Sequence, residues 1–159
     1  MSRAAARCAL RQYHSLHQEF VVHAEPHATD VLRAHRTRVA LVVDDEDSLR
    51  LVLRRFLERR HWTVIEARNG EEALRTLAEA RQAPDAVIMD FHMPGLSGGA
   101  LCARIAAEHP GLADRLIIAS GDEDAARRSL AKELVDCPVL AKPFELSQLA
   151  TALDLMLAS

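Results

Sequence analysis

Acidic, basic and hydroxyl side chains follow four of five short apolar stretches in the chain. Asp44 and Asp45 follow the first stretch, Asp90 the third, Ser120 the fourth and Lys142 the fifth. Each stretch is rich in aliphatic or β-branched residues, which is typical of a buried strand. In open parallel α/β sheets, ligands bind outside the carboxyl ends of the strands. The five side chains therefore predict a shared site at one edge of a sheet.

The predicted site contains the groups that phosphoryl chemistry requires. Three neighbouring carboxylates repel one another, and they are expected to take up protons or a cation. Carboxylate oxygens without imidazole or thiolate suit a hard cation, and Mg²⁺ is the natural choice. A lysine and a hydroxyl beside that ion suit a phosphoryl group. A carboxylate that also acts as a nucleophile would form an aspartyl phosphate.

Each residue also has an ordinary alternative role. Asp44 and Asp45 could be helix N-caps, and Asp90 could cap a loop or a helix. Lys142 could be a solvated surface lysine, and Ser120 a simple turn residue. The shared position of all these residues at strand ends is what favours the chemical interpretation.

Hydrophobic periodicity predicts five strands that alternate with five helices. The expected strands are 39–43, 62–65, 85–90, 116–119 and 138–141, and the expected helices are 49–57, 71–80, 97–108, 123–134 and 146–157. Such alternation predicts a doubly wound parallel sheet with right-handed crossovers. The helix 123–134 has only Leu130 and Leu134 as large apolar residues, so we expect it to be the least firmly packed.

Composition and charge predict a globular body that is preceded by a basic arm. The chain of 159 residues is 49% hydrophobic and 27% charged, which is typical of a globular protein. Residues 1–38 hold six arginines and three acids, a balance of +3. We expect residues 1–37 to form an arm that is partly helical or disordered, and residues 38–159 to form the domain. His14 and His17 in the arm have a spacing that could hold a metal, but no third ligand is marked out.

The cysteines and the hydropathy profile predict a cytoplasmic protein. Cys8, Cys102 and Cys137 form no C-x-x-C pair, which favours reduced thiols. No apolar run approaches the roughly 18 residues that span a bilayer, and the N-terminus lacks the apolar segment of a signal peptide.

Four motifs resemble those of the receiver domain of bacterial two-component response regulators. The resemblance covers residues 38–158, and its motifs match in order and in spacing: 42–46 (VVDDE), 89–95 (MDFHMPG), 118–121 (IASG) and 141–144 (AKPF). The fold that the resemblance implies is flavodoxin-like, with a five-stranded parallel sheet in the order 2-1-3-4-5 and five flanking helices.

The resemblance also implies a metal site and a phosphoacceptor. Asp90 is implied as the phosphoacceptor. Asp45 and Asp90 would bind Mg²⁺ directly, and Asp44 would act largely through water. The backbone carbonyl of His92 would complete the protein ligands.

Two further side chains have implied roles at the phosphoryl group. Lys142 would contact the carboxylate and then the phosphoryl oxygens, and Ser120 would donate a hydrogen bond to the phosphoryl group. The Lys142–Pro143 peptide bond is expected to be cis. Receivers commonly carry an aromatic residue three positions before the lysine, and this chain has Val139 there. His92 and Asp122 occupy positions that tune the lifetime of the phosphoryl group in the family.

The function that this resemblance implies is phosphorelay signalling by a stand-alone receiver. The phosphoryl group would come from a histidine kinase or a histidine phosphotransfer protein, and the output would be contact with a downstream protein. The chain would not be an enzyme beyond its own phosphorylation and dephosphorylation. Only 17 residues follow Lys142, so we expect no DNA-binding domain. We also expect no membrane segment, and a monomer or weak dimer.

Two other functions compete with this one. A phosphorylation-independent adaptor or scaffold is favoured by Val139 and opposed by the intact set of site residues. A Mg²⁺-dependent phosphohydrolase would usually have a second acid two residues after the nucleophile, and His92 stands there.

Overall fold

The computed structural model describes residues 36–130, 134 and 136–158. Within this part, the strands are β1 (Arg38–Val43), β2 (Trp62–Ala67), β3 (Ala86–Asp90), β4 (Leu116–Ser120) and β5 (Val139–Ala141). The helices are α3 (Asp47–Arg59), α4 (Gly70–Glu79), α5 (Gly98–Glu108), α6 (Glu123–Ser129) and α7 (Leu146–Leu157), with one 3-10 helix, η2 (Pro110–Arg115). The arm predicted for residues 1–37 lies outside the described residues except for its last two, so the domain boundary stays a prediction.

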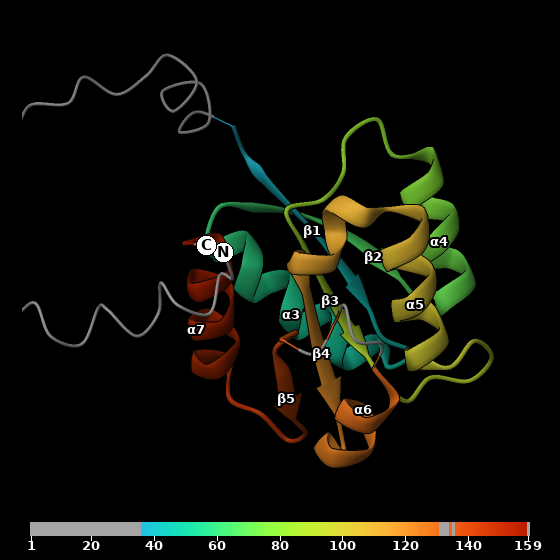
Figure 1. Cartoon of the computed structure of the whole chain (residues 1–159). Coiled ribbons are helices and arrows are strands. Elements are labelled where there is room, and N and C mark those ends of the chain that lie inside the picture. The colour runs from blue at the N-terminus through green and yellow to red at the C-terminus, as the bar shows by residue number, and fades with distance from the viewer. Residues whose placement is uncertain (1–35, 131–133, 135, 159) are drawn as a thin grey trace, which may run out of the picture. The chain divides into compact units, whose positions relative to one another are not determined.

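The five strands form one parallel sheet in the order β2-β1-β3-β4-β5 (Figure 1). This confirms the predicted flavodoxin-like fold class. The chain winds outward from β1 in both directions, so β1 and β3 are neighbours at the point where the winding reverses. Val43 of β1 lies in register with Met89 of β3. Asp44 and Asp90, which follow these two residues, therefore emerge side by side.

Helices cover both faces of the sheet, and each face has its own apolar core (Figure 1). Side chains alternate along a strand, so Ala40 and Val42 face α3 and α7, whereas Leu41 and Val43 face α4 and α5. Because β1 is covered on both faces, its residues from 40 to 43 are all fully buried. This two-sided burial explains why the strand is a continuous apolar run.

Side chains define where several helices begin. Asn69 accepts a hydrogen bond from the backbone of Glu72 at the start of α4, and Ser97 accepts one from Ala100 at the start of α5. Ser97 is thus the N-cap of α5. No helix in the described residues is both long enough and apolar enough to cross a bilayer.

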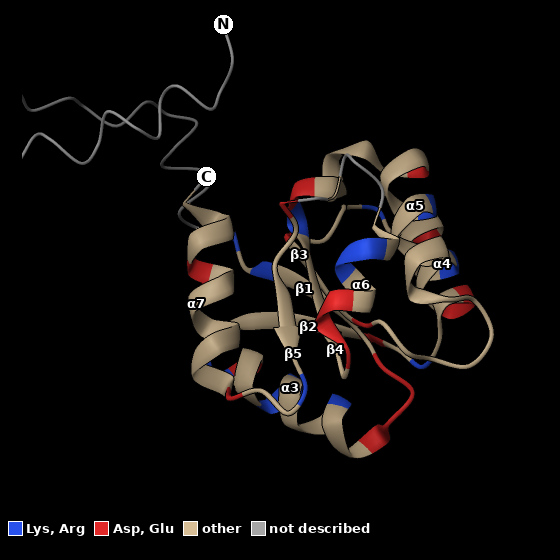
Figure 2. Ribbon diagram, turned by 60° about the horizontal axis from the view of Figure 1, so that its bottom comes forward, with Lys and Arg blue, Asp and Glu red and all other residues tan. Residues whose placement is uncertain are grey.

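Helix α6 is shorter than predicted. The expected helix 123–134 ends at Ser129, because Leu130 has an extended backbone with ψ of 141°. In α6 the one buried residue is Ala126, while Leu134 beyond the helix is buried in the core. Leu134 therefore reaches the core from outside the α-helix. Acids begin α6 and arginines end it, as its dipole favours (Figure 2).

Candidate functional site

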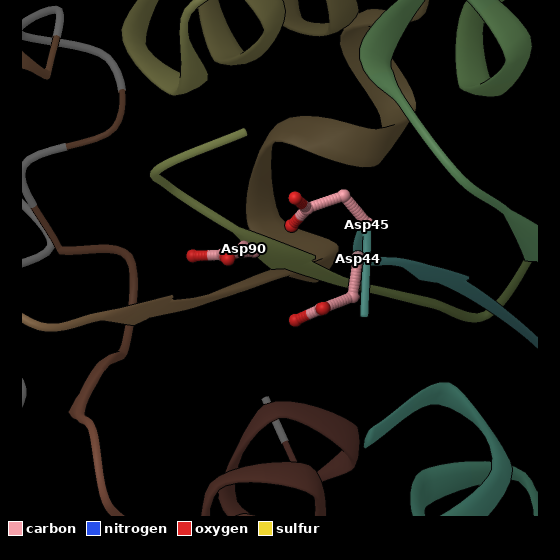
Figure 3. Close-up of side chains that lie close together, drawn as sticks. All are labelled: Asp44, Asp45 and Asp90. Carbon is pink, nitrogen blue, oxygen red and sulfur yellow. The ribbon is translucent and has the colours of Figure 1, made fainter. Parts of the chain in front are cut away.

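Three aspartates meet at the carboxyl ends of β1 and β3 (Figure 3). Asp44, Asp45 and Asp90 each offer a carboxylate oxygen, and these oxygens lie within 4.8 Å of one another. Asp44 and Asp90 are buried, whereas Asp45 is exposed. The cluster is where the sequence places it, because parallel strands bring their carboxyl ends to one edge of the sheet.

Backbone amides hold one oxygen of each buried carboxylate. Asp44 Oδ1 accepts a hydrogen bond from the N–H of Glu46 at 2.8 Å, and Asp90 Oδ1 accepts one from the N–H of His92 at 3.0 Å. In both cases the donor lies two residues after the acid, as in an Asx turn. Each carboxylate therefore has a fixed orientation and keeps its second oxygen for other partners.

Lys142 joins the two buried carboxylates. Its Nζ lies 2.9 Å from Asp44 Oδ2 and 2.9 Å from Asp90 Oδ2. Burial lowers the pKa of this lysine, but the hydrogen bonds and charges of Asp90 and Asp44 outweigh burial and hold the pKa above its ordinary value. The side chain is therefore a permanent cation at neutral pH. The Lys142–Pro143 bond is cis, as expected.

Ser120 is fully buried at the end of β4 and is bonded to its own loop. Its hydroxyl donates to the carbonyl of Asp122 at 2.8 Å and accepts from the N–H of Asp122 at 3.1 Å. Its oxygen also lies 3.4 Å from His92 Nδ1. The hydroxyl is thus brought to the same edge of the sheet, next to the loop that follows Asp90. The implied role of the His92 carbonyl as a metal ligand stays a prediction.

Arg50 is a buried site residue that the sequence reasoning missed. Among the described residues, four polar or charged side chains are buried: Asp44, Arg50, Asp90 and Ser120. The guanidinium of Arg50 donates to the backbone carbonyl of Asp44 at 2.6 Å. A signal was available, because Arg50 continues the buried stripe of Leu53 and Leu57 at helical spacing.

Val139 lies inside the core that β5 shares with α5 and α6. It is 8% exposed and pairs in register with Ile118 of β4. A buried aliphatic side chain here cannot alternate between an inward and an outward position as an aromatic ring can. Where receivers commonly have an aromatic side chain, this chain therefore has a buried valine.

The donor set fits a hard divalent cation. The cluster consists of carboxylates alone, and carboxylate oxygens are the ligands that Mg²⁺ prefers. Within the described residues, the exposed carboxylate of Asp45 has no hydrogen bond or ion pair that would compete with an ion. Lys142 supplies one positive charge beside the two buried acids. The site can therefore hold a cation and an anionic group together.

Comparison with known proteins identifies the family. A family model described as the response regulator receiver domain matches residues 40–154. The chain is 39% identical over 118 residues to the sensor kinase CckA of Brucella abortus, a match that covers 74% of this chain but 12% of the kinase. It is 29% identical over 112 residues to sporulation initiation phosphotransferase F of Bacillus subtilis, covering 70% of this chain and 87% of that protein.

A solved structure of a response regulator is also similar to this chain. The response regulator protein TrrA of Thermotoga maritima, in complex with Mg²⁺ and BeF, superposes with a TM-score of 0.62 at 26% identity. The superposition covers 76% of this chain and 99% of that one.

Proposed function

The chain belongs to the response regulator receiver domain family, and we propose that it accepts a phosphoryl group on Asp90 in two-component signalling. The donor would be a histidine kinase or a histidine phosphotransfer protein. The single observation that carries the proposal is the position of Asp90, which is buried at the end of β3, 2.9 Å from Lys142 and beside Asp44 and Asp45.

The site residues suggest how the transfer proceeds. One carboxylate oxygen of Asp90 attacks the phosphorus of a phosphohistidine, a P–O bond forms, and the P–N bond breaks. The electron pair of the broken bond stays on the imidazole nitrogen of the donor. The product at Asp90 is an acyl phosphate. Lys142 neutralises negative charge that would otherwise repel the incoming phosphoryl group.

Asp44, Asp45 and Asp90 would hold Mg²⁺. When bound, the ion would neutralise charge on the phosphoryl oxygens as the group is transferred. The backbone N–H of His92 keeps one oxygen of Asp90 engaged, which leaves the other oxygen to react. Ser120 would exchange its present acceptor, the carbonyl of Asp122, for a phosphoryl oxygen, and that exchange would alter the loop after β4.

The output would be contact with a downstream protein by a receiver that stands alone in the cytoplasm. Sporulation initiation phosphotransferase F, 87% of which is matched by this chain, is a relative that consists largely of this domain. The free buried thiols of Cys102 and Cys137 support a reducing compartment.

A phosphorylation-independent adaptor is the second candidate, and Val139 is the observation that favours it. An aromatic side chain at this position could change its burial when Ser120 moves, and so alter the surface of α6 and β5. Valine cannot couple the two in this way. The intact cluster of Asp44, Asp45, Asp90 and Lys142 weighs against it, because an adaptor has no need to keep three carboxylates together.

Intact mass after incubation with Mg²⁺ and acetyl phosphate tests the proposal. We expect the wild type to gain one phosphoryl group, and Asp90→Asn to gain none. Asp114→Asn, which removes the same charge from an exposed acid in η2, is the matched control and should be phosphorylated like the wild type. If the wild type stays unmodified and beryllofluoride also leaves its NMR spectrum unchanged, the adaptor is the better account.

A further inference from the structure

Arg50 is a charged side chain buried beside the acidic loop, and burial of a charge requires a reason. Its residue is 6% exposed. Moving a guanidinium out of water is costly unless it is paired and hydrogen-bonded. Every buried side-chain nitrogen or oxygen in the described residues has a partner. The partners of Arg50 therefore indicate which part of the structure its buried charge stabilises.

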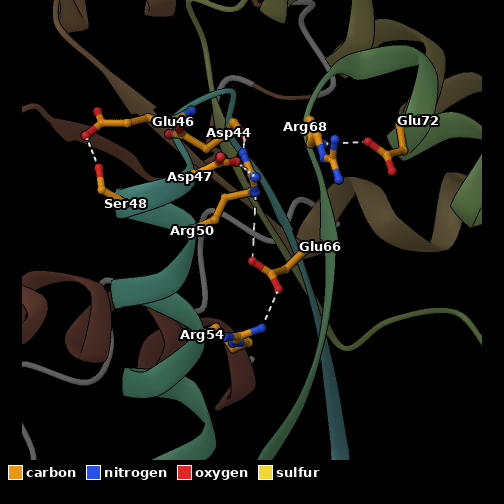
Figure 4. Close-up of polar contacts among 9 residues, drawn as sticks. All are labelled: Asp44, Glu46, Asp47, Ser48, Arg50, Arg54, Glu66, Arg68 and Glu72. Carbon is orange, nitrogen blue, oxygen red and sulfur yellow. Dashed lines mark hydrogen bonds and ion pairs between the residues drawn. The ribbon is translucent and has the colours of Figure 1, made fainter.

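Arg50 has three polar contacts: one with the turn after β1, one with the first residue of α3 and one with β2 (Figure 4). Nη1 donates to the backbone carbonyl of Asp44 at 2.6 Å, and Nη2 bonds the carboxylate of Asp47. Nε lies 3.8 Å from Glu66 Oε1 on β2, and Glu66 in turn accepts from Arg54 at 3.0 Å. Arg50 thus connects the acidic turn to helix α3 and to the neighbouring strand.

The carbonyl that Arg50 holds belongs to the peptide between Asp44 and Asp45. The N–H of Asp44 donates to the carbonyl of Ala67 at 3.2 Å, and its carboxylate is held by Glu46 and Lys142. With Arg50 on the carbonyl, all the polar groups of Asp44 are engaged. The plane of the following peptide, which determines where the side chain of Asp45 begins, is then fixed as well.

The geometry points to Arg50 as a positioning residue of the metal site, which sets the Asp44–Asp45 peptide so that the carboxylate of Asp45 stays near that of Asp90. This inference rests on the proposed function, because it assumes that the three aspartates bind Mg²⁺. Asp45 is exposed, and its carboxylate has no hydrogen bond or ion pair with the described residues. Its placement therefore depends on its backbone.

Mg²⁺ affinity, measured by calorimetry without any phosphodonor, tests the role of Arg50. Removing a group that orients a metal ligand commonly costs about 10–100-fold in affinity, and we expect such a loss for Arg50→Gln. Arg50→Lys can still donate to one acceptor and should lose less. Arg54→Gln is the matched control, because Arg54 pairs with the same Glu66 but has no contact with Asp44. It should bind Mg²⁺ like the wild type.

A second readout separates positioning from general damage to the fold. With acetyl phosphate, Arg50→Gln should need more Mg²⁺ for half-maximal phosphorylation and should approach the wild-type rate at saturating Mg²⁺. Wild-type Mg²⁺ affinity in folded Arg50→Gln, or an equal loss in Arg54→Gln, would overturn the inference. If Arg50→Gln does not fold, Arg50→Lys decides: weaker binding supports the role, and unchanged binding overturns it. Failure of the wild type to bind Mg²⁺ would instead overturn the metal site itself.

Discussion

At the scale of single residues, Lys142 pairs with two of the carboxylates that are proposed to bind Mg²⁺. Its Nζ contacts Oδ2 of both Asp44 and Asp90, so it neutralises the same carboxylates that are proposed to hold Mg²⁺. A unit charge about 4 Å from a divalent ion repels it by about 2 kcal/mol even at the dielectric constant of water. We therefore expect the lysine to lower the affinity of this site for Mg²⁺ while it stabilises the cluster of acids.

We predict that Lys142→Met binds Mg²⁺ about 30-fold more tightly than the wild type, the equivalent of that 2 kcal/mol. Calorimetric titration measures the change. The variant removes the cation without adding a new polar group. Weaker binding in Lys142→Met would contradict the view that the lysine and the metal compete for Asp44 and Asp90.

The pH dependence of stability gives a second test of Lys142. Because its folded pKa is raised above 10.5, its contribution to stability is complete below the unfolded pKa and is lost as pH rises through the folded pKa. The free energy of unfolding of the wild type minus that of Lys142→Met should thus be constant near neutral pH and fall above about pH 10.5. Urea unfolding at a series of pH values measures it, and a difference that grows at high pH would contradict the pairing.

Sequence reasoning predicted which residues meet at the strand ends, and it missed Arg50, which lies in a helix. Asp44, Asp90 and Lys142 were predictable because the ends of parallel strands converge whatever the details of packing. Arg50 lies in the first turn of α3 and donates a hydrogen bond back to the carbonyl of Asp44. Its position on a buried stripe was visible, but the carbonyl that accepts its hydrogen bond was not.

At the scale of elements, the start of α5 packs directly against Phe91, the residue that follows Asp90. Gly98, the first residue of α5, donates its N–H to the carbonyl of Phe91 at 3.2 Å. A Cβ at Gly98 would lie 2.4 Å from that carbonyl oxygen and 2.7 Å from Phe91 Cα. Because both atoms are backbone, a side chain here would move the helix or the loop after Asp90.

We predict that Gly98→Ala lowers the free energy of unfolding by about 1–3 kcal/mol, the usual cost of forcing extra volume into a packed site. Gly111→Ala is the control, since a Cβ there has nothing within 4 Å. Urea denaturation of both variants measures the effect. Equal stabilities of the two variants would show that the contact between α5 and Phe91 is not tight.

The sequence predicted which helices and strands form better than it predicted where each one ends. Strands and the helices with caps, such as α5 after Ser97, appear where periodicity places them. Helix α6 ends at Ser129, where Leu130 takes an extended backbone, and Leu134 is buried in the core beyond the end of the helix. The leucine spacing alone did not reveal this break in the backbone.

At the scale of the whole domain, the core between the sheet and α5 holds two cysteines that report on its opening. Burial raises the pKa of Cys102 to about 12 and that of Cys137 to about 12. Thiols react as thiolates, so both should be inert to Ellman's reagent at pH 8 while the domain is closed. Measured reaction rates would then follow the opening of this core.

We predict that a Cys8→Ser variant shows no rapid thiol reaction under native conditions and two reactive thiols in denaturant. The substitution removes the one cysteine outside the described residues. Rapid modification of the native variant would contradict the burial of Cys102 and Cys137. Adding beryllofluoride and Mg²⁺ to the same assay would show whether occupation of the site stabilises this core.

The central claim is that Asp90 itself carries the phosphoryl group, and chemical trapping tests it most directly. Borohydride reduces an acyl phosphate to the alcohol and releases phosphate, so a phosphorylated aspartate becomes homoserine. After incubation with Mg²⁺ and acetyl phosphate, tandem mass spectrometry of the tryptic peptide 82–104 should find homoserine at position 90 and an unchanged Asp85. Homoserine at another aspartate, or a phosphorylated protein with position 90 unmodified, would contradict the assignment.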